Sequence, residues 1–361
     1  MGTFTSSSEI YTSRLASALV PGAVEISILT PPGFSKNDSL PLLLHLQGGG
    51  LDHRMLERLQ PFYEKLWEEG TLPPMVVGCF NGRGSWYLNY IDGSELWEDF
   101  IFEFQKYIVS NFNTATGPEN NYIMGLSMGG MGALRTAFKH PEKFGAVVSA
   151  GAAINPVYEY QDLQPRNYVN QHNLPPEEQA KRWGWPVDNA FYEANNVPTI
   201  ARDNAEAIRN SGLKIYVEAG DKDFFNSHDG AEFLHHTLWE YRIEHEYRLL
   251  HDCDHMGASL HWRYHDMHAW LGRVSRKLKH LEKYVPPSAN PAHIEYMSWL
   301  ATGCAGKAPE VTYLDEFDGA WVSQLRNGDY LPDTVKDNMD KPLDGVFRNK
   351  YTLFACRGHH D

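Results

Sequence analysis

The sequence predicts an α/β fold in which a mostly parallel central sheet is covered by helices on both faces. Short apolar runs typical of buried strands alternate with longer stretches in which apolar residues recur at helical spacing. A Gly-x-Ser-x-Gly turn at residues 125–129 follows one such run and opens a helical stretch. We also expect an insertion and an extra carboxyl-terminal segment outside this repeating pattern.

Six apolar runs are expected to form strands, and residues 23–30 could supply antiparallel strands at the sheet edge. The runs are residues 41–46, 75–80, 122–124, 146–149, 213–218 and 246–250. Helices are expected where the apolar spacing changes to about 3.6 residues. They are residues 56–69, 95–110, 128–140, 230–241 and 269–283.

Two segments depart from this alternation. Residues 156–211 are rich in Pro, Asn, Gln and aromatic residues, and we interpret them either as a lid or substrate wall or as a surface excursion without function. Pro286-Pro287 ends the last expected helix, so residues 1–287 are the expected main domain. Residues 288–361 carry enough aromatic residues to pack on this domain or on the partner in a homodimer.

Composition narrows the class of protein. The chain has 361 residues, 42% of them hydrophobic, and a net charge of −14, which disfavours binding to nucleic acid or anionic membranes. No run of about 18 apolar residues is present, so no membrane span is expected. The four cysteines form no Cys-x-x-Cys pair, and we expect reduced thiols in a cytoplasmic protein. A Cys304–Cys356 bridge is the alternative.

Ser127 is the candidate nucleophile. In nucleophile turns of this kind the serine lies on a sharp, strained connection between a strand and a helix. Gly125 and Gly129 lack a Cβ, so the turn can pack tightly beneath the serine. The alternative is an inert serine in a glycine-rich turn.

The same chemistry needs N–H donors for the developing oxyanion. Met128 follows the nucleophile and begins a helix, so its N–H is one candidate. The second donor should come from a loop after an earlier strand, and three glycines follow the run 42–46. Gly49 is the first choice and Gly50 the next, whereas a simple turn is the alternative.

The acid should follow a strand that comes after the nucleophile, because the chain order in this fold is Ser, Asp or Glu, then His. Asp221 and Asp223 both follow the run 213–218. We favour Asp223 because the loop needs a residue or two to turn back toward the sheet.

The base should follow the next strand, residues 246–250. His255 lies on the following loop and is the candidate general base. His251 lies too close to the strand end to reach the serine. Later histidines at 261, 265 and 268 fall at the expected start of a helix, mostly on the surface. The nearby acidic residues could in principle bind zinc, but no His-Glu-x-x-His pattern occurs, so we expect no catalytic metal and no cofactor.

Several segments resemble the esterase D family of α/β-hydrolases, which is also described as "putative esterase". It includes S-formylglutathione hydrolases, feruloyl esterases and antigen 85-like acyltransferases. The resemblance covers roughly residues 20–285. It is carried by residues 125–134, 85–89, 97–100 and 220–224 and by the Asp254-His255 pair. It implies the α/β-hydrolase fold and supports Asp223 over Asp221. The Gln47-Gly48 pair departs from the His-Gly more common in the family, and the tail matches nothing in it.

We therefore expect a serine carboxylic-ester hydrolase that acts on a small-molecule ester through an acyl-enzyme. Trp86 and Tyr87 are the candidate substrate-binding residues, with ordinary core packing as the alternative. Acyl transfer to another acceptor and thioester cleavage are the alternatives on the same fold. A catalytically inactive binding protein is the alternative from a different class.

Overall fold

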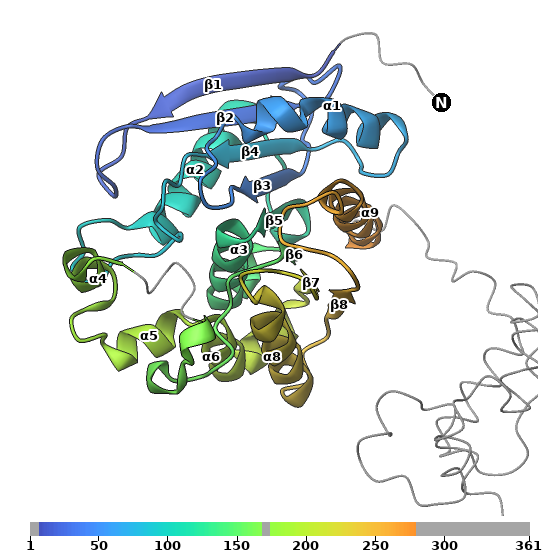
Figure 1. The fold of residues 1–361 in the computed structure, drawn as a ribbon. Helices are drawn as coiled ribbons and strands as arrows, with labels where there is room; N and C mark the ends of the chain where they lie inside the picture. The colour runs from blue at the N-terminus through green and yellow to red at the C-terminus, as the bar shows by residue number, and fades with distance from the viewer. Residues whose placement is uncertain (1–6, 168–173, 279–361) are drawn as a thin grey trace, which may run out of the picture. The chain divides into compact units, whose positions relative to one another are not determined.

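The computed structural model describes residues 7–167 and 174–278. Their strands form one sheet in the order β1-β2-β4-β3-β5-β6-β7-β8 (Figure 1). The β1–β2 and β2–β4 pairs are antiparallel, and every other neighbouring pair is parallel. The bounds are β1 Glu9–Leu15, β2 Val24–Thr30, β3 Leu42–Leu46, β4 Val76–Phe80, β5 Asn121–Leu126, β6 Ala146–Ala150, β7 Lys214–Gly220 and β8 Glu246–Leu250.

Helices cover both faces of this sheet (Figure 1). The side chains of α1 and α9 join the core on one face, and those of α2, α3, α6 and α8 join the core on the other. The helix bounds are α1 Met55–Glu68, α2 Trp97–Phe112, α3 Met128–Lys139, α4 Pro176–Trp183, α5 Asn189–Asn195, α6 Val197–Asp203, α7 Ala205–Ser211, α8 Ser227–Glu240 and α9 Leu260–Leu278. Short 3-10 helices are η1 Pro118–Asn120, η2 Pro141–Lys143, η3 Tyr160–Asp162 and η4 Pro165–Asn167.

Strand β5 shows why the buried strands have continuous apolar sequences rather than alternating ones. Successive side chains of a strand point to opposite faces, and here both faces are covered. Tyr122, Met124 and Leu126 therefore join the core beneath α1 and α9, whereas Ile123 joins the core beneath α2 and α3. The prediction of a mostly parallel sheet with helices on both faces is confirmed.

One local prediction was wrong, and one strand was missed. The last helix, α9, begins at Leu260 rather than at residue 269, because its aromatic and histidine-rich first turns hide the buried stripe of Tyr264, Met267 and Leu271. His261 and His265 are exposed, as expected for most of these histidines, whereas His268 lies on this stripe and is fully buried. An additional edge strand, β1, went unnoticed because its residues are mostly exposed and carry little apolar signal.

The expected insertion forms helices α4 to α7 between β6 and β7. Its aromatic residues Trp183 and Tyr192 are buried, and α6 contacts both α3 and α8. Cys79 and Cys253 are free and buried. Across the described ranges, no helix has the length and apolar character needed to cross a membrane. The expected segment 288–361, with Cys304 and Cys356, lies outside the described residues.

Candidate active site

Ser127 occupies a strained turn between β5 and α3. Its φ of 57° and ψ of −119° lie in a region that side-chain-bearing residues rarely adopt. The turn packs so closely that a Cβ on Gly125 would come within 2.3 Å of the Gly129 carbonyl carbon. A Cβ on Gly129 would come equally close, 2.3 Å, to the Leu46 carbonyl oxygen. The glycines predicted beneath the serine are therefore required by the packing.

His255 and Asp223 form a buried hydrogen-bonded pair on the loops that follow β8 and β7. The His255 Nδ1 to Asp223 Oδ2 distance is 2.6 Å. Burial raises the pKa of Asp223, but the hydrogen bonds from His255 and from the Phe225 N–H outweigh it, so the pKa lies below its usual value. The aspartate is therefore held as an anion against the imidazole, which leaves Nε2 as the ring nitrogen available for proton transfer.

The serine turn lies beside this pair at the same edge of the sheet. The Ser127 N–H donates to the Ala150 carbonyl at 2.8 Å, and the next residue, Gly151, faces the imidazole. A Cβ on Gly151 would lie 3.4 Å from His255 Nδ1 and 3.6 Å from Asp223 Oδ2. Among the described residues, no hydrogen bond joins Ser127 Oγ to His255. The structure thus brings the three predicted side chains to one edge without closing the last contact.

The competing residues Asp221 and His251 form a separate pair on the surface. His251 Nδ1 lies 2.8 Å from Asp221 Oδ2, and the His251 side chain is 82% exposed. With Asp252 these groups offer ligand atoms within 4.8 Å of one another, although exposed acidic groups are common without an ion. Because this pair is solvated, it lacks the buried setting in which His255 and Asp223 lie.

The predicted oxyanion loop is a tight turn after β3. The Leu51 N–H donates to the Gly48 carbonyl at 3.2 Å, and Gly50 has a φ of 75°. Gly49 is exposed at the tip of this turn, whereas Gly48 lies against the serine, since a Cβ on it would be 3.9 Å from Ser127 Cβ. Met128 is buried and begins α3, so its N–H has no acceptor within the helix.

Trp86 and Tyr87 are buried, and Tyr87 contacts the residue that precedes this loop. Both have positive φ, 58° and 54°, and Tyr87 is fully buried. The Tyr87 hydroxyl donates to the Gln47 carbonyl at 3.1 Å, and its ring fills the space left by the missing side chain of Gly132. In this structure Tyr87 braces the strand end before the glycine turn and presents no surface to a ligand.

Sequence reasoning missed a buried ion pair that supports the histidine loop. Arg263 of α9 contacts Glu218 of β7 at 2.8 Å, and both side chains are fully buried. Arg263 Nη1 also donates to the Asp254 carbonyl at 2.6 Å, one residue before His255. Burial raises the pKa of Glu218 against the opposing effect of Arg263. A carboxylate within the apolar run 213–218 was the available signal, because buried charges need partners.

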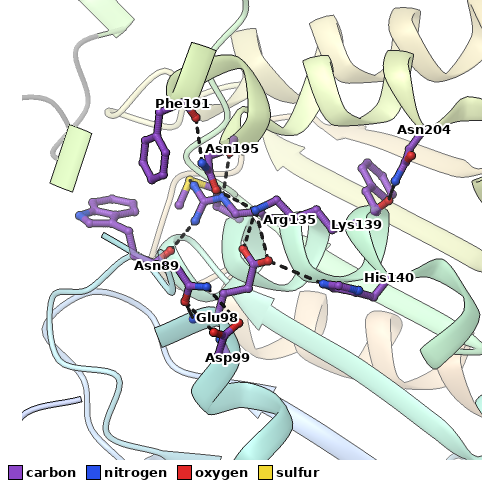
Figure 2. Close-up of polar contacts among 12 residues, drawn as sticks. Asn89, Glu98, Asp99, Arg135, Lys139, His140, Phe191, Asn195 and Asn204 are labelled. Carbon is purple, nitrogen blue, oxygen red and sulfur yellow. Dashed lines mark hydrogen bonds and ion pairs between the residues drawn. The ribbon is translucent and has the colours of Figure 1, made fainter. Parts of the chain in front are cut away.

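A second buried network joins α2, α3 and α5, as Figure 2 shows. Lys139 Nζ lies 2.9 Å from Glu98 Oε2 and donates to Asn195 Oδ1 at 2.7 Å. Arg135 donates to the carbonyls of Asn195 and Trp86, both at 2.8 Å. Burial lowers the pKa of Arg135 to about 10. The network therefore holds the Trp86 backbone and helix α5 of the insertion against α3, the helix that follows Ser127.

Three further buried polar side chains link β3, α1 and α9. The Tyr63 hydroxyl lies 2.7 Å from His45 Nδ1 and 3.1 Å from His268 Nε2. His268 Nδ1 faces the Tyr264 carbonyl at 2.7 Å, which can only accept, so Nδ1 carries the proton and Tyr63 donates to Nε2. Burial lowers the pKa of His45 to about 3 and that of His268 to about 4, so both rings are neutral.

The candidate residues gather where parallel strands end, and the strand order with these loops is that of the α/β-hydrolase fold. The class of protein that this arrangement defines is an α/β-hydrolase. Residues 17–281 match the family described as "Putative esterase". This match covers more than half of the chain, which therefore belongs to that family.

Two kinds of relatives are similar to this chain. The Mycobacterium tuberculosis protein named Esterase Rv1288 is 29% identical over 129 residues, a match that spans 34% of this chain and 28% of the relative. A solved ferulic acid esterase superposes with a TM-score of 0.59 at 19% identity, covering 75% of this chain and all of that one. An S-formylglutathione hydrolase from Agrobacterium tumefaciens gives 0.57 at 17% identity, covering 77% and 98%. At these identities the solved structures show the fold alone.

Proposed function

We propose that this protein hydrolyses carboxylic esters of small molecules through an acyl-enzyme, with Ser127 as the nucleophile. The 2.6 Å hydrogen bond between His255 and Asp223 carries the proposal. Histidine and aspartate are the residue types that activate a serine nucleophile. Here they are buried and hydrogen-bonded on loops beside the strained turn of Ser127. Asp223 holds the Nδ1–H tautomer of His255, so that Nε2 can accept the Ser127 proton.

The reaction then proceeds in two steps, acylation of Ser127 and hydrolysis of the acyl-serine. Ser127 Oγ attacks the ester carbonyl while His255 takes its proton, and the imidazolium returns this proton to the leaving alcohol as the carbon–oxygen bond breaks. Water attacks the acyl-serine in the same way, with His255 as the base, and releases the acid. A shift of the Ser127 side chain toward Nε2 is required for the first step, since active-site hydrogen bonds often tighten only when substrate binds.

The tetrahedral intermediates need two N–H donors for their oxyanion. We assign Met128 at the N-terminus of α3 and Gly49 in the turn after β3 to this role, with Gly50 as the alternative. Tyr87 acts indirectly in this proposal, because it holds the Gln47 carbonyl just before the glycine turn, and Arg135 anchors the preceding Trp86 carbonyl. The likeness to a solved S-formylglutathione hydrolase makes thioesters worth including among the trial substrates.

A fluorophosphonate probe tests the nucleophile directly. We expect the wild-type protein to be labelled and to release p-nitrophenol from p-nitrophenyl acetate, whereas Ser127→Ala does neither. Ser94→Ala is the matched control, because Ser94 is exposed on a loop outside the site. An unlabelled wild-type protein would favour a catalytically inactive binding protein. Added alcohol acceptors would reveal acyl transfer by the appearance of new esters.

A further inference from the structure

A cavity of about 430 Å³ lies between α1, the start of α9 and the end of β5. This volume is within the range of small-molecule sites, which is about 300–1,000 Å³. Most of its lining side chains are apolar or aromatic, and Arg58 and His261 are the two that carry nitrogen donors. The lining residues are Leu51, Met55, Arg58, Leu59, Phe62, Leu126, Met256, Gly257, Leu260, His261 and Tyr264.

Three of the lining residues are neighbours in the chain of the proposed catalytic residues or of the glycine turn. Leu126 directly precedes Ser127, Met256 directly follows His255, and Leu51 ends the glycine turn. A Cβ placed on Gly48 would lie 3.9 Å from both Leu51 Cδ1 and Ser127 Cβ, so these two atoms can be no more than twice that distance apart. A ligand in this cavity would therefore lie beside the turn that carries the nucleophile.

The charge of the cavity differs from that of the whole chain. The net charge is −14, yet none of the described lining residues is acidic. Arg58 is exposed at the cavity and forms no ion pair with any described residue. The neighbouring Arg54, by contrast, lies 2.6 Å from Asp52. An arginine left without a carboxylate beside an apolar chamber offers two parallel N–H donors to a bound anion.

We propose that this cavity binds one arm of the substrate, an apolar chain or ring that ends in a carboxylate. The apolar walls would take the body of the arm, and Arg58 would pair with the carboxylate at the opening, with the His261 ring beside it. The inference rests on the proposed function only in that the arm belongs to the ester cleaved at Ser127. The preferred substrates would then be esters of an apolar acid or alcohol that also carry a free carboxylate.

Inhibition of p-nitrophenyl acetate hydrolysis tests the inference, because the small acetyl ester does not need the cavity. The probes are octanoate, octanol and octylammonium, which share one chain and differ in their head group. We expect competitive inhibition in the order octanoate, octanol, octylammonium. The octanoate to octanol ratio of inhibition constants should shift about threefold to fivefold in Arg58→Gln, as expected for a partly solvated ion pair, and should recover in Arg58→Lys.

Arg273→Gln is the matched control, because Arg273 is an exposed arginine of α9 that does not line the cavity. It should leave the ratio unchanged, whereas Leu59→Trp, which fills the chamber, should weaken octanoate and octanol alike. Equal inhibition by the three probes, or an Arg58→Gln ratio equal to that of the wild type, would overturn the inference. Absence of p-nitrophenyl acetate hydrolysis would instead reject the proposed function, so the two failures are distinguishable.

Discussion

Replacing Arg263 by Met tests whether the buried ion pair holds the histidine loop. The substitution leaves the Glu218 carboxylate fully buried without its partner and removes the donor to the Asp254 carbonyl. Breaking a buried pair in this way costs about 3–5 kcal/mol. Because a domain of this kind is stable by only about 5–15 kcal/mol, we expect a large fall in the urea midpoint at pH 7.

Two companions make the test specific. Glu218→Gln combined with Arg263→Met should recover much of the lost stability, since no buried charge remains. Arg248→Met is the matched surface control, because Arg248 of β8 pairs with Glu246 and Asp266 but is 30% exposed, so its loss should cost less than about 1 kcal/mol. A loss in Arg263→Met no larger than in Arg248→Met would refute the reasoning. In the folded Arg263 variant we expect kcat to fall more than KM rises.

Three further predictions concern the site and its support. Asp223→Asn should lower kcat about 10³–10⁴-fold by removing the anion that orients His255, whereas Asp221→Asn, a solvated residue, should keep near-normal kinetics. Buried His45 and His268 have pKa values of about 3 and about 4. In the unfolded chain both histidines bind protons below about pH 6.5, whereas in the folded protein they stay neutral. The free energy of unfolding should therefore be about 4 kcal/mol lower at pH 5 than above pH 6.5. His268→Gln should make the free energy of unfolding depend less on pH. Gly129→Ala should prevent folding measured by circular dichroism, because its Cβ would lie 2.3 Å from a strand carbonyl.

The alternation of strands and helices could be predicted because each element carries its own periodic signal. The residues of the serine turn and of the His–Asp pair were also predictable, since each follows a recognisable strand at a fixed order in the chain. The preference for Asp223 and His255 over Asp221 and His251 rested on loop length, and the structure separates these pairs by burial.

The supporting contacts were beyond sequence reasoning because they join residues that are distant in the chain. Arg263 and Glu218 are 45 positions apart, and neither lies in a motif. The start of α9 was misplaced for a related reason, since aromatic and histidine side chains there are buried by packing on α1 rather than by an evident apolar stripe. Contacts between residues that are distant in the chain depend on tertiary packing, which no local sequence pattern encodes.

The network in Figure 2 has a consequence for how substrate reaches the serine. Moving α5 outward would break the hydrogen bonds from Arg135 and Lys139 to Asn195, at a cost of about 3–6 kcal/mol for two bonds to charged groups. An open state that costs this much is populated about 1% of the time or less. Amide hydrogen exchange should therefore show α3 and α5 opening as a single cooperative unit. The insertion then behaves at α5 as a fixed wall, and we expect no opening of α5 to admit substrate to Ser127.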